Sequence, residues 1–110
     1  MEVRAFVPDL FRHLAACDLA VVQGGLTTTM ELVAARRPFL YFPLADHFEQ
    51  NRHVAHRLDR YGGGRRMDYA TSDPDAIAEA IAHEIDRPVD YRPVATDGAA
   101  RAAALIAPLL

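Results

Sequence analysis

The sequence has few of the features that mark secreted, membrane or nucleic-acid-binding proteins. It contains a single cysteine, Cys17, so no disulfide can form within the chain, and we expect Cys17 to be a small core residue. No apolar run approaches the roughly 18 residues that a transmembrane helix needs. The N-terminus carries Glu2 and Arg4 and soon meets Pro8, which argues against a signal peptide. These absences predict a cytoplasmic protein.

Concentrated positive charge is also missing. The net charge is −3, and adjacent basic residues occur only as Arg36-Arg37 and Arg65-Arg66. Binding to nucleic acid requires a basic footprint, so we expect no nucleic acid partner. There is no internal repeat or low-complexity linker. With 110 residues, 51% of them hydrophobic and 25% charged, the chain is predicted to form one globular domain.

The chain is organised around a strand, a pair of glycines and a helix. Leu19–Val22 is a run of four apolar residues without alternation, which predicts a strand buried on both faces in a parallel sheet. Gly24 and Gly25 end the run. Leu26, Met30, Val33 and Ala34 then recur at helical spacing, and Pro38 ends this helix from outside.

Such a turn can bind an anion, because the first N–H groups of a helix lack intrahelical partners and the helix dipole adds partial positive charge. Glu31 lies about one turn further on, where its carboxylate could accept hydrogen bonds from sugar hydroxyls. The motif is neither the dinucleotide fingerprint nor a Walker A loop. The local pattern therefore leaves a ligand-binding turn and a purely structural turn both open.

The rest of the chain continues the alternation of strands and helices. We predict strands at Val3–Val7, Phe39–Phe42 and Arg65–Tyr69. We predict a helix capped by Asp9, with Leu10, Leu14 and Cys17 on one face, and a second helix over Asp46–Tyr61, ended by Gly62–Gly64. A third helix is predicted from Pro74, with Ile77, Ile81 and Ile85 toward the core. After a connection at Asp86–Thr96, an Ala-rich helix is predicted over Gly98–Ile106.

This order predicts a parallel α/β sheet with right-handed crossovers. Ligands of such sheets bind outside the carboxyl ends of the strands. The loops Gln23–Thr28 and Pro43–Asn51 lie at that edge in the predicted sheet, and both are rich in polar residues. We therefore expect the functional site there.

Several segments at these positions match a known pattern. They are Phe6–Leu10, Cys17-Asp18, Gly24–Thr27, Glu31, Pro38–Pro43 and Glu49–Asn51. Over about residues 2–85 the sequence resembles the second half of the donor domain of two-domain (GT-B) glycosyltransferases. It is most similar to the peptidoglycan N-acetylglucosaminyl transferases, whose donor part is the glycosyltransferase family 28 C-terminal domain.

The resemblance implies a Rossmann-like three-layer fold with a mostly parallel sheet. It also implies transfer of a hexosyl group from a UDP-sugar to a hydroxyl acceptor, with N-acetylglucosamine as one candidate for the sugar, and with no cofactor and no metal. Its substrate-binding residues would be Phe6 and Val7 at the nucleobase, Gly24, Gly25, Leu26, Thr27 and Thr28 at the diphosphate, Glu31 at the ribose, and Gln50 with Glu49 or Asn51 at the transferred sugar.

The departures from that family limit what these residues can do. The acceptor domain and the first strand–helix units of the donor domain have no counterpart in this sequence, so we expect residues 1–110 to be a single, partial donor-binding domain without a catalytic residue. It would need the acceptor domain in the same or another chain. Where the close relative has two glutamines, this chain has Gln50-Asn51, which leaves the sugar open. The resemblance also allows a site of action at the inner membrane surface.

Three alternatives to an intact transferase stay open. The chain is a non-catalytic nucleotide-sugar-binding subunit, part of a sugar-nucleotide epimerase, or an inactive fragment. Without the missing units, the Leu19–Gln23 strand loses a neighbour, and an exposed apolar edge is a template for pairing. We therefore predict that Val3–Val7 and a second copy of the chain compete for this edge, with self-association favoured.

The candidate residues also have structural readings. Glu31 could be an ordinary helical carboxylate, and Glu49 could form a capping box with Asp46. Asn51 fits a satisfied amide on the apolar side of its helix, whereas Gln50 has no evident structural role. The hydroxyls of Thr27, Thr28 and Thr29 could cap their helix. The spacing of His47, His53 and His56 favours a solvated helix face over a metal site.

Overall fold

The computed structural model describes residues 1–110 and contains a three-stranded parallel sheet in the order β1-β2-β3. The strands are β1 (Ala20–Gln23), β2 (Phe39–Phe42) and β3 (Arg65–Arg66). The helices are α1 (Leu10–Ala16), α2 (Leu26–Ala34), α3 (Ala55–Tyr61), α4 (Pro74–Glu84) and α5 (Gly98–Ile106). A π-helical turn, η1 (Glu49–Val54), leads into α3, and a 3-10 turn, η2 (Ala107–Leu109), follows α5.

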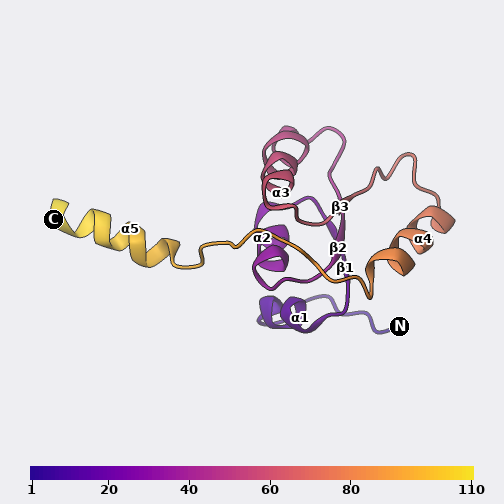
Figure 1. Ribbon diagram of the computed structural model, residues 1–110, viewed down its shortest axis with the longest axis horizontal. Helices are drawn as coiled ribbons and strands as arrows, with labels where there is room; N and C mark the ends of the chain where they lie inside the picture. Colours follow the sequence, from indigo (N-terminus) through magenta and orange to yellow (C-terminus); the bar gives the residue numbers. More distant parts are fainter.

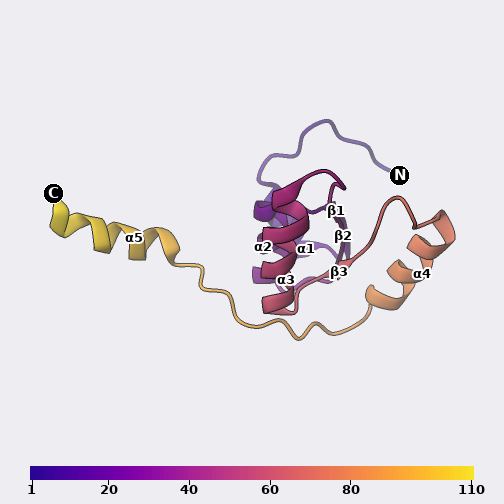
Figure 2. The same cartoon turned by 90° about the horizontal axis from the view of Figure 1, so that it is seen from above.

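The elements form three layers. Helices α1, α2 and α3 cover one face of the sheet, and α4 lies on the other face (Figures 1 and 2). β1 pairs with β2 from Ala20↔Phe39 to Gln23↔Phe42, and β2 pairs with β3 at Leu40↔Arg65 and Tyr41↔Arg66. The predicted Rossmann-like, parallel α/β arrangement is therefore confirmed.

The core lies between the sheet and the layer of α1, α2 and α3. Alternate residues of β2, Phe39 and Tyr41, point into it and meet Leu32 of α2 and Leu58 of α3. Leu32 and Leu58 are both 0% exposed. Burying one such side chain contributes about 1.5–3 kcal/mol, so this layer holds most of the stabilising contacts of the chain.

β1 is buried on one face only, so the prediction of a strand buried on both faces was wrong. Ala20 and Val22 pack against the core, but Val21 on the opposite face is 50% exposed. The reason is the position of α4, which packs beside β2, where it covers the wholly buried Leu40. An apolar run gives the buried character of a strand but not the number of layers that cover it.

The predicted strand at Val3–Val7 does not form. Residues 1–7 have no helix or strand, and Val3 and Phe6 are each about 80% exposed, at 81% and 80%. An isolated strand has no partner for its backbone groups, and this segment does not pair with β1. β1 is therefore an edge strand with one open side (Figure 1).

Helix boundaries follow the sequence signals closely, with small differences in the caps. Asp9 is the N-cap of α1 but has a positive φ of 50° and makes no side-chain capping bond. Asp73 caps α4, with its Oδ1 accepting from the N–H of Ala76 at 2.8 Å, and Pro74 follows in the first turn as predicted.

Two predicted details of this part of the chain were wrong. The residue of α4 that is fully buried against the sheet is Ala80, whereas Ile85 is 37% exposed, because close packing on β2 requires a small side chain. β3 also ends at Arg66 rather than Tyr69. Only one further bond continues the pairing, from the N–H of Met67 to the carbonyl of Tyr41, before a turn begins at Asp68.

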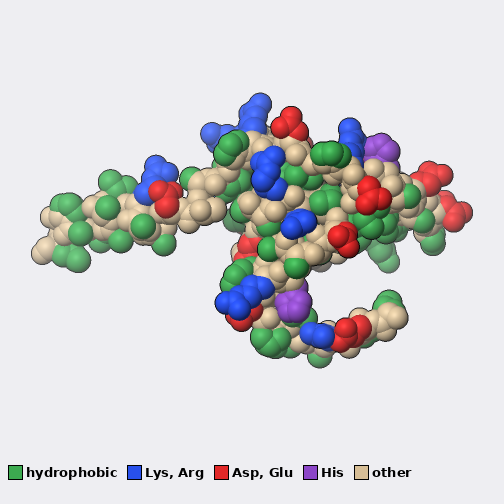
Figure 3. Space-filling model, turned by 60° about the horizontal axis from the view of Figure 1, so that its bottom comes forward, with side chains coloured by type: hydrophobic (Ala, Val, Ile, Leu, Met, Phe, Trp, Pro, Cys, Tyr) green, Lys and Arg blue, Asp and Glu red, His purple; other side chains and the backbone are tan.

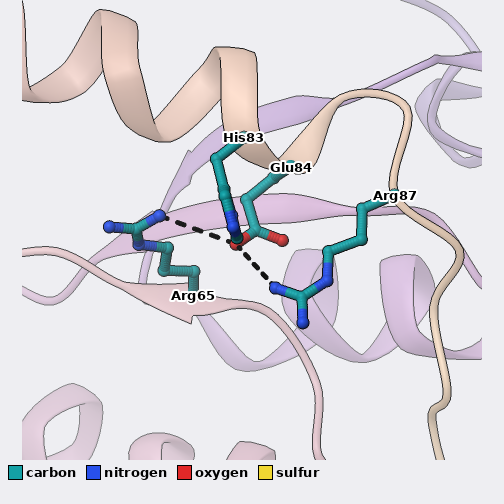
Figure 4. Close-up of polar contacts among 4 residues, drawn as sticks. All are labelled: Arg65, His83, Glu84 and Arg87. Carbon is teal, nitrogen blue, oxygen red and sulfur yellow. Dashed lines mark hydrogen bonds and ion pairs between the residues drawn. The ribbon is translucent and has the colours of Figure 1, made fainter.

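An ion-pair cluster joins α4 to β3 (Figure 4). The Oε1 atom of Glu84 lies 3.6 Å from Arg65 of β3, 3.0 Å from Nδ1 of His83 and 3.8 Å from Arg87. Arg65 and Arg87 are largely exposed, so each pair contributes at most about 1 kcal/mol. The cluster lies on the α4 face of the sheet.

The C-terminal part of the chain leaves the body of the molecule. The segment after α4 crosses the amino edge of the sheet, where the Tyr91 hydroxyl donates to the carbonyl of Arg37 at 2.8 Å. α5 has the predicted bounds, but none of its residues is buried, and it projects away from the sheet (Figures 1 and 2). Figure 3 shows apolar side chains spread along it.

Candidate functional site

The two loops that were predicted to form the site meet at the carboxyl edge of the sheet. The contact is between Gly24, after β1, and Pro43, after β2. A Cβ atom on Gly24 would lie 3.0 Å from Cα of Pro43 and 3.4 Å from Oε1 of Gln50. A side chain at this position would have to displace Pro43 by a few tenths of an ångström, so close packing between the loops accounts for Gly24.

Gly25 has no such requirement. Its φ of −69° and ψ of 141° are accessible to any residue, and a Cβ atom there would meet nothing within 4 Å. The space in front of Gly25 is therefore open to solvent. A glycine at this position leaves the backbone accessible to a ligand without serving the fold.

The N-terminus of α2 begins at this open position and is uncapped. Gly25 is the N-cap residue and offers no side chain, and the first N–H to bond back is that of Thr29, to the carbonyl of Gly25 at 3.2 Å. The earlier N–H groups of the first turn are free to bind an anion.

The threonines do not cap this helix, so that structural prediction was wrong. Thr29 is buried, and its Oγ1 donates to the carbonyls of Gly25 at 2.7 Å and Leu26 at 3.1 Å. A hydroxyl that donates to carbonyls does not accept from N–H groups at the helix start. Thr27 and Thr28 make no side-chain hydrogen bond to the protein, so both hydroxyls are available to a ligand.

Glu31 lies on the same face of α2 as these two hydroxyls. It follows Thr27 by four residues and Thr28 by three, the spacings at which helical side chains are neighbours. Its carboxylate is half-buried and makes no hydrogen bond or ion pair. The uncapped helix start, two hydroxyls and one carboxylate thus share one side of α2.

Gln50 has a structural role, contrary to the prediction. It is 8% exposed, and its Oε1 accepts from the N–H of Leu44 at 2.9 Å. Its Nε2 lies 3.5 Å from Oε1 of Gln23, the last residue of β1. Gln50 is four residues before the buried Val54 and eight before the buried Leu58, so helical spacing itself places it on the apolar side of η1 and α3.

Asn51 is the satisfied amide that one of the two readings anticipated. Its Nδ2 donates to the carbonyls of Leu44, Ala45 (3.1 Å) and His47 (3.0 Å), and its Oδ1 accepts from Arg66 at 2.9 Å. Sequence reasoning missed Arg66, which it treated only as half of a basic pair. No local signal links β3 to a residue 15 positions earlier.

Glu49 is exposed and has no partner. The proposed capping box with Asp46 does not form, because the turn begins only at Glu49, with Phe48 as its N-cap and no side-chain capping bond. The N–H of Gln50 donates to Nδ1 of His47 at 3.3 Å. His53 packs its ring edge-on against Phe48, with centroids 5.4 Å apart. The chain contains no group of three or more His, Cys, Asp or Glu side chains arranged to hold a metal ion.

Phe6 and Val7 lie in the irregular N-terminal segment. Val7 lines a shallow hollow of about 330 Å³ beside the start of α1, together with Glu2, Arg4, Leu10 and His13. Phe6 points into solvent. No hydrogen bond joins this segment to the β1–α2 turn, so a nucleobase contact by these residues stays a prediction.

Three side chains, two in the core and one at its border, have raised pKa values. Burial raises the pKa of Tyr41 and of Tyr91 above 10, and it also raises the pKa of the Cys17 thiol, which donates to the carbonyl of Leu14 at 3.1 Å. All three belong to the core or its border. None lies at the β1–α2 turn.

No helix of the chain combines the length and the apolar character needed to cross a membrane.

Comparison with known proteins gives the family. Residues 1–108 match the glycosyltransferase family 28 C-terminal domain. The chain is 36% identical over 88 residues to the UDP-N-acetylglucosamine--N-acetylmuramyl-(pentapeptide) pyrophosphoryl-undecaprenol N-acetylglucosamine transferase of Acidiphilium cryptum, an alignment that covers 80% of this chain and 24% of that protein.

Two archaeal proteins show similar likeness. An uncharacterised glycosyltransferase of Methanosarcina mazei is 33% identical over 81 residues, which cover 74% of this chain and 21% of that protein. An uncharacterised glycosyltransferase of Methanopyrus kandleri is 33% identical over 103 residues, which cover 93% of this chain and 30% of that protein. The chain thus spans between a fifth and a third of the length of these relatives. No solved structure matches it. By its matching residues and its fold, the chain belongs to the glycosyltransferase family 28 C-terminal domain family.

Proposed function

We propose that this chain forms the donor-binding part of a hexosyltransferase and binds a UDP-sugar at the carboxyl edge of its sheet. The observation that carries the proposal is Gly25: a glycine that neither the backbone conformation nor any neighbour requires, at the uncapped start of α2. Family membership supplies the class of ligand.

The diphosphate is assigned to the first turn of α2. Backbone N–H groups from Gly25 to Thr28 and the hydroxyls of Thr27 and Thr28 would donate to its oxygens. Glu31 would accept from the ribose hydroxyls. In transfer, the sugar–phosphate bond breaks and the diphosphate leaves with the bonding electrons, so preorganised donors around it would stabilise the leaving group.

The transferred sugar is assigned to the loop after β2. The exposed carboxylate of Glu49 and the remaining N–H of the Gln50 amide are available to its hydroxyls. The nucleobase is assigned to Phe6 and Val7. Because one relative is named as a transferase of N-acetylglucosamine from UDP-N-acetylglucosamine, we propose this sugar nucleotide as the first donor to test.

Transfer also needs an acceptor-binding part, which we propose lies outside these 110 residues, in the same polypeptide or in another chain. The proposal includes no metal ion and no cofactor. It assigns the reaction to the cytoplasm, as predicted from the sequence.

Calorimetric titration of UDP and UDP-N-acetylglucosamine into the chain tests this assignment. A carboxylate–hydroxyl bond contributes about 1.5–3 kcal/mol, so Glu31→Ala should weaken both ligands roughly 10- to 150-fold. Glu79→Ala, on the exposed side of α4, is the matched control and should bind as the wild type does. Equal affinity of Glu31→Ala and wild type would contradict the ribose role.

A further inference from the structure

The loop after β2 is held by a chain of hydrogen bonds that crosses the carboxyl ends of all three strands. Gln50 contacts Gln23, the last residue of β1, and the N–H of Leu44, which follows β2. Asn51 holds the carbonyl side of the same loop and accepts from Arg66, the last residue of β3. Two adjacent residues of η1 therefore tie the loop to both outer strands.

Arg66 is the only charged residue in this series of hydrogen bonds. Its side chain lies on the face of the sheet that carries η1 and α3, whereas the neighbouring Arg65 lies on the opposite face, beside Glu84 of α4 (Figure 4). Pairing with β2 fixes its backbone through the register Tyr41↔Arg66. Arg66 is thus anchored to the sheet rather than to a flexible loop.

The bond from Arg66 decides how the Asn51 amide is oriented. A guanidinium can only donate, so the atom 2.9 Å from it must be the amide oxygen. The amide nitrogen then faces the carbonyls of Ala45 and His47, at 3.1 and 3.0 Å. In the reverse orientation the amide oxygen would face these carbonyl oxygens, which repel it.

The clamped segment is also where the sugar end of the donor would lie. Pro43 packs within 3.0 Å of the Cβ position of Gly24, next to the start of α2. Residues Leu44–Glu49 extend from there and expose His47 and Glu49 to solvent. Movement of Leu44–Glu49 would displace Glu49, which is assigned to the sugar, whereas the diphosphate is assigned to a separate element, the first turn of α2.

We propose that Arg66 is a positioning residue for specificity: by orienting Asn51 it holds the Leu44–Glu49 loop so that the site distinguishes a UDP-hexose from UDP alone. Arg66 itself touches neither ligand. This inference rests on the proposed function for its ligand, but the loop clamp itself can be measured without one.

The first experiment measures the clamp by amide hydrogen exchange on the full chain. Arg66→Ala should speed exchange at the N–H groups of Leu44, Gln50 and Asn51 by roughly three- to fivefold, because an exposed charged bond is lost. Arg66→Lys, which retains a donor, should restore part of the protection. Arg65→Ala is the matched control and should leave this loop unchanged. Unchanged exchange in Arg66→Ala would overturn the inference.

The second experiment compares the affinities for UDP-N-acetylglucosamine and for UDP. Arg66→Ala should lower the affinity for UDP-N-acetylglucosamine by roughly three- to fivefold and leave the affinity for UDP unchanged. Asn51→Asp, which places an oxygen against the loop carbonyls, should lower the affinity for UDP-N-acetylglucosamine further, again without changing that for UDP. An equal loss for both ligands would mean a merely structural role and overturn the specificity claim. If the wild type binds neither ligand, the proposed function and this claim fail together, while faster exchange would still establish the clamp.

Discussion

Two glycine-containing turns lie at opposite edges of the sheet, and they differ in whether the fold accounts for every glycine. Gly24–Gly25 follows β1 at the carboxyl edge, and Gly62–Gly64 precedes β3 at the amino edge. In the second turn, Gly62 and Gly64 have positive φ angles of 68° and 69°, and a Cβ atom on Gly63 would lie 2.6 Å from Val33. The fold requires all three.

The surroundings differ in the same way. The amino edge is covered by the segment after α4, in which Tyr91 accepts from Arg36 at 3.0 Å and packs edge-on against Phe39. The carboxyl edge has no such cover over Gly25. A glycine whose conformation and neighbours explain it says little about function, whereas Gly25 has neither explanation and stands at the carboxyl edge of the sheet, where a ligand can approach.

The largest effect is expected from Gly64→Ala. The residue has a positive φ, and an added Cβ atom would lie 2.4 Å from the Phe39 ring, so strain and overpacking together should cost about 2–5 kcal/mol of stability. Gly98→Ala, where a Cβ atom meets nothing within 4 Å, is the matched control. Denaturant titrations followed by circular dichroism give both values; an equally small change in the two would show that the amino edge is looser than described.

High pH should lower the stability of the fold. Because burial raises the folded-state pKa values of Tyr41 and Tyr91, the unfolded chain releases their protons first as the pH rises above 10. Stability is therefore complete below that pH and should fall by about 1.4 kcal/mol per pH unit for each tyrosine above it. Tyr41→Phe should reduce the slope, as measured by denaturation at several pH values. If the wild type and Tyr41→Phe lost stability with the same dependence on pH, Tyr41 would not contribute to this loss.

Gly25→Ala is the substitution that contrasts the two edges most directly. Stability should change by less than about 0.5 kcal/mol, since the backbone angles and the space both allow a methyl group. Affinity for UDP should fall roughly tenfold, because the methyl group would stand where the diphosphate approaches. Calorimetry and denaturation on one preparation give both numbers. A large loss of stability with no loss of affinity would reverse the comparison.

The smallest effect concerns the lateral edge of β1. The N–H of Ala20 bonds toward β2, so by alternation the backbone groups of Val21 point to the open side, where we propose that a second copy pairs. Sedimentation velocity should show a mean mass that rises with concentration in the wild type and rises less in Val21→Lys. A constant monomer mass for the wild type would count against self-association.

Local patterns predicted the elements better than their surroundings. Apolar runs and helical spacing gave β1, β2 and α2 within one or two residues, because these signals depend on neighbours in sequence. The same signals proposed a strand at Val3–Val7 and a second buried face for β1, which require partners that a local pattern does not contain. Of the site, Gly25 and Glu31 could be chosen from the sequence, but the link from Arg66 to Asn51 could not.

The π-helical turn at Glu49–Val54 leads directly into α3 and carries the two amides that hold the loop after β2. Although this turn is closed by i→i+5 bonds, the buried side of Val54 and Leu58 continues backward to Gln50, four residues before Val54. Gln50 and Asn51 are consecutive, yet one reaches β1 and the other β3. Two consecutive side chains of one short turn thus bridge the whole width of the sheet.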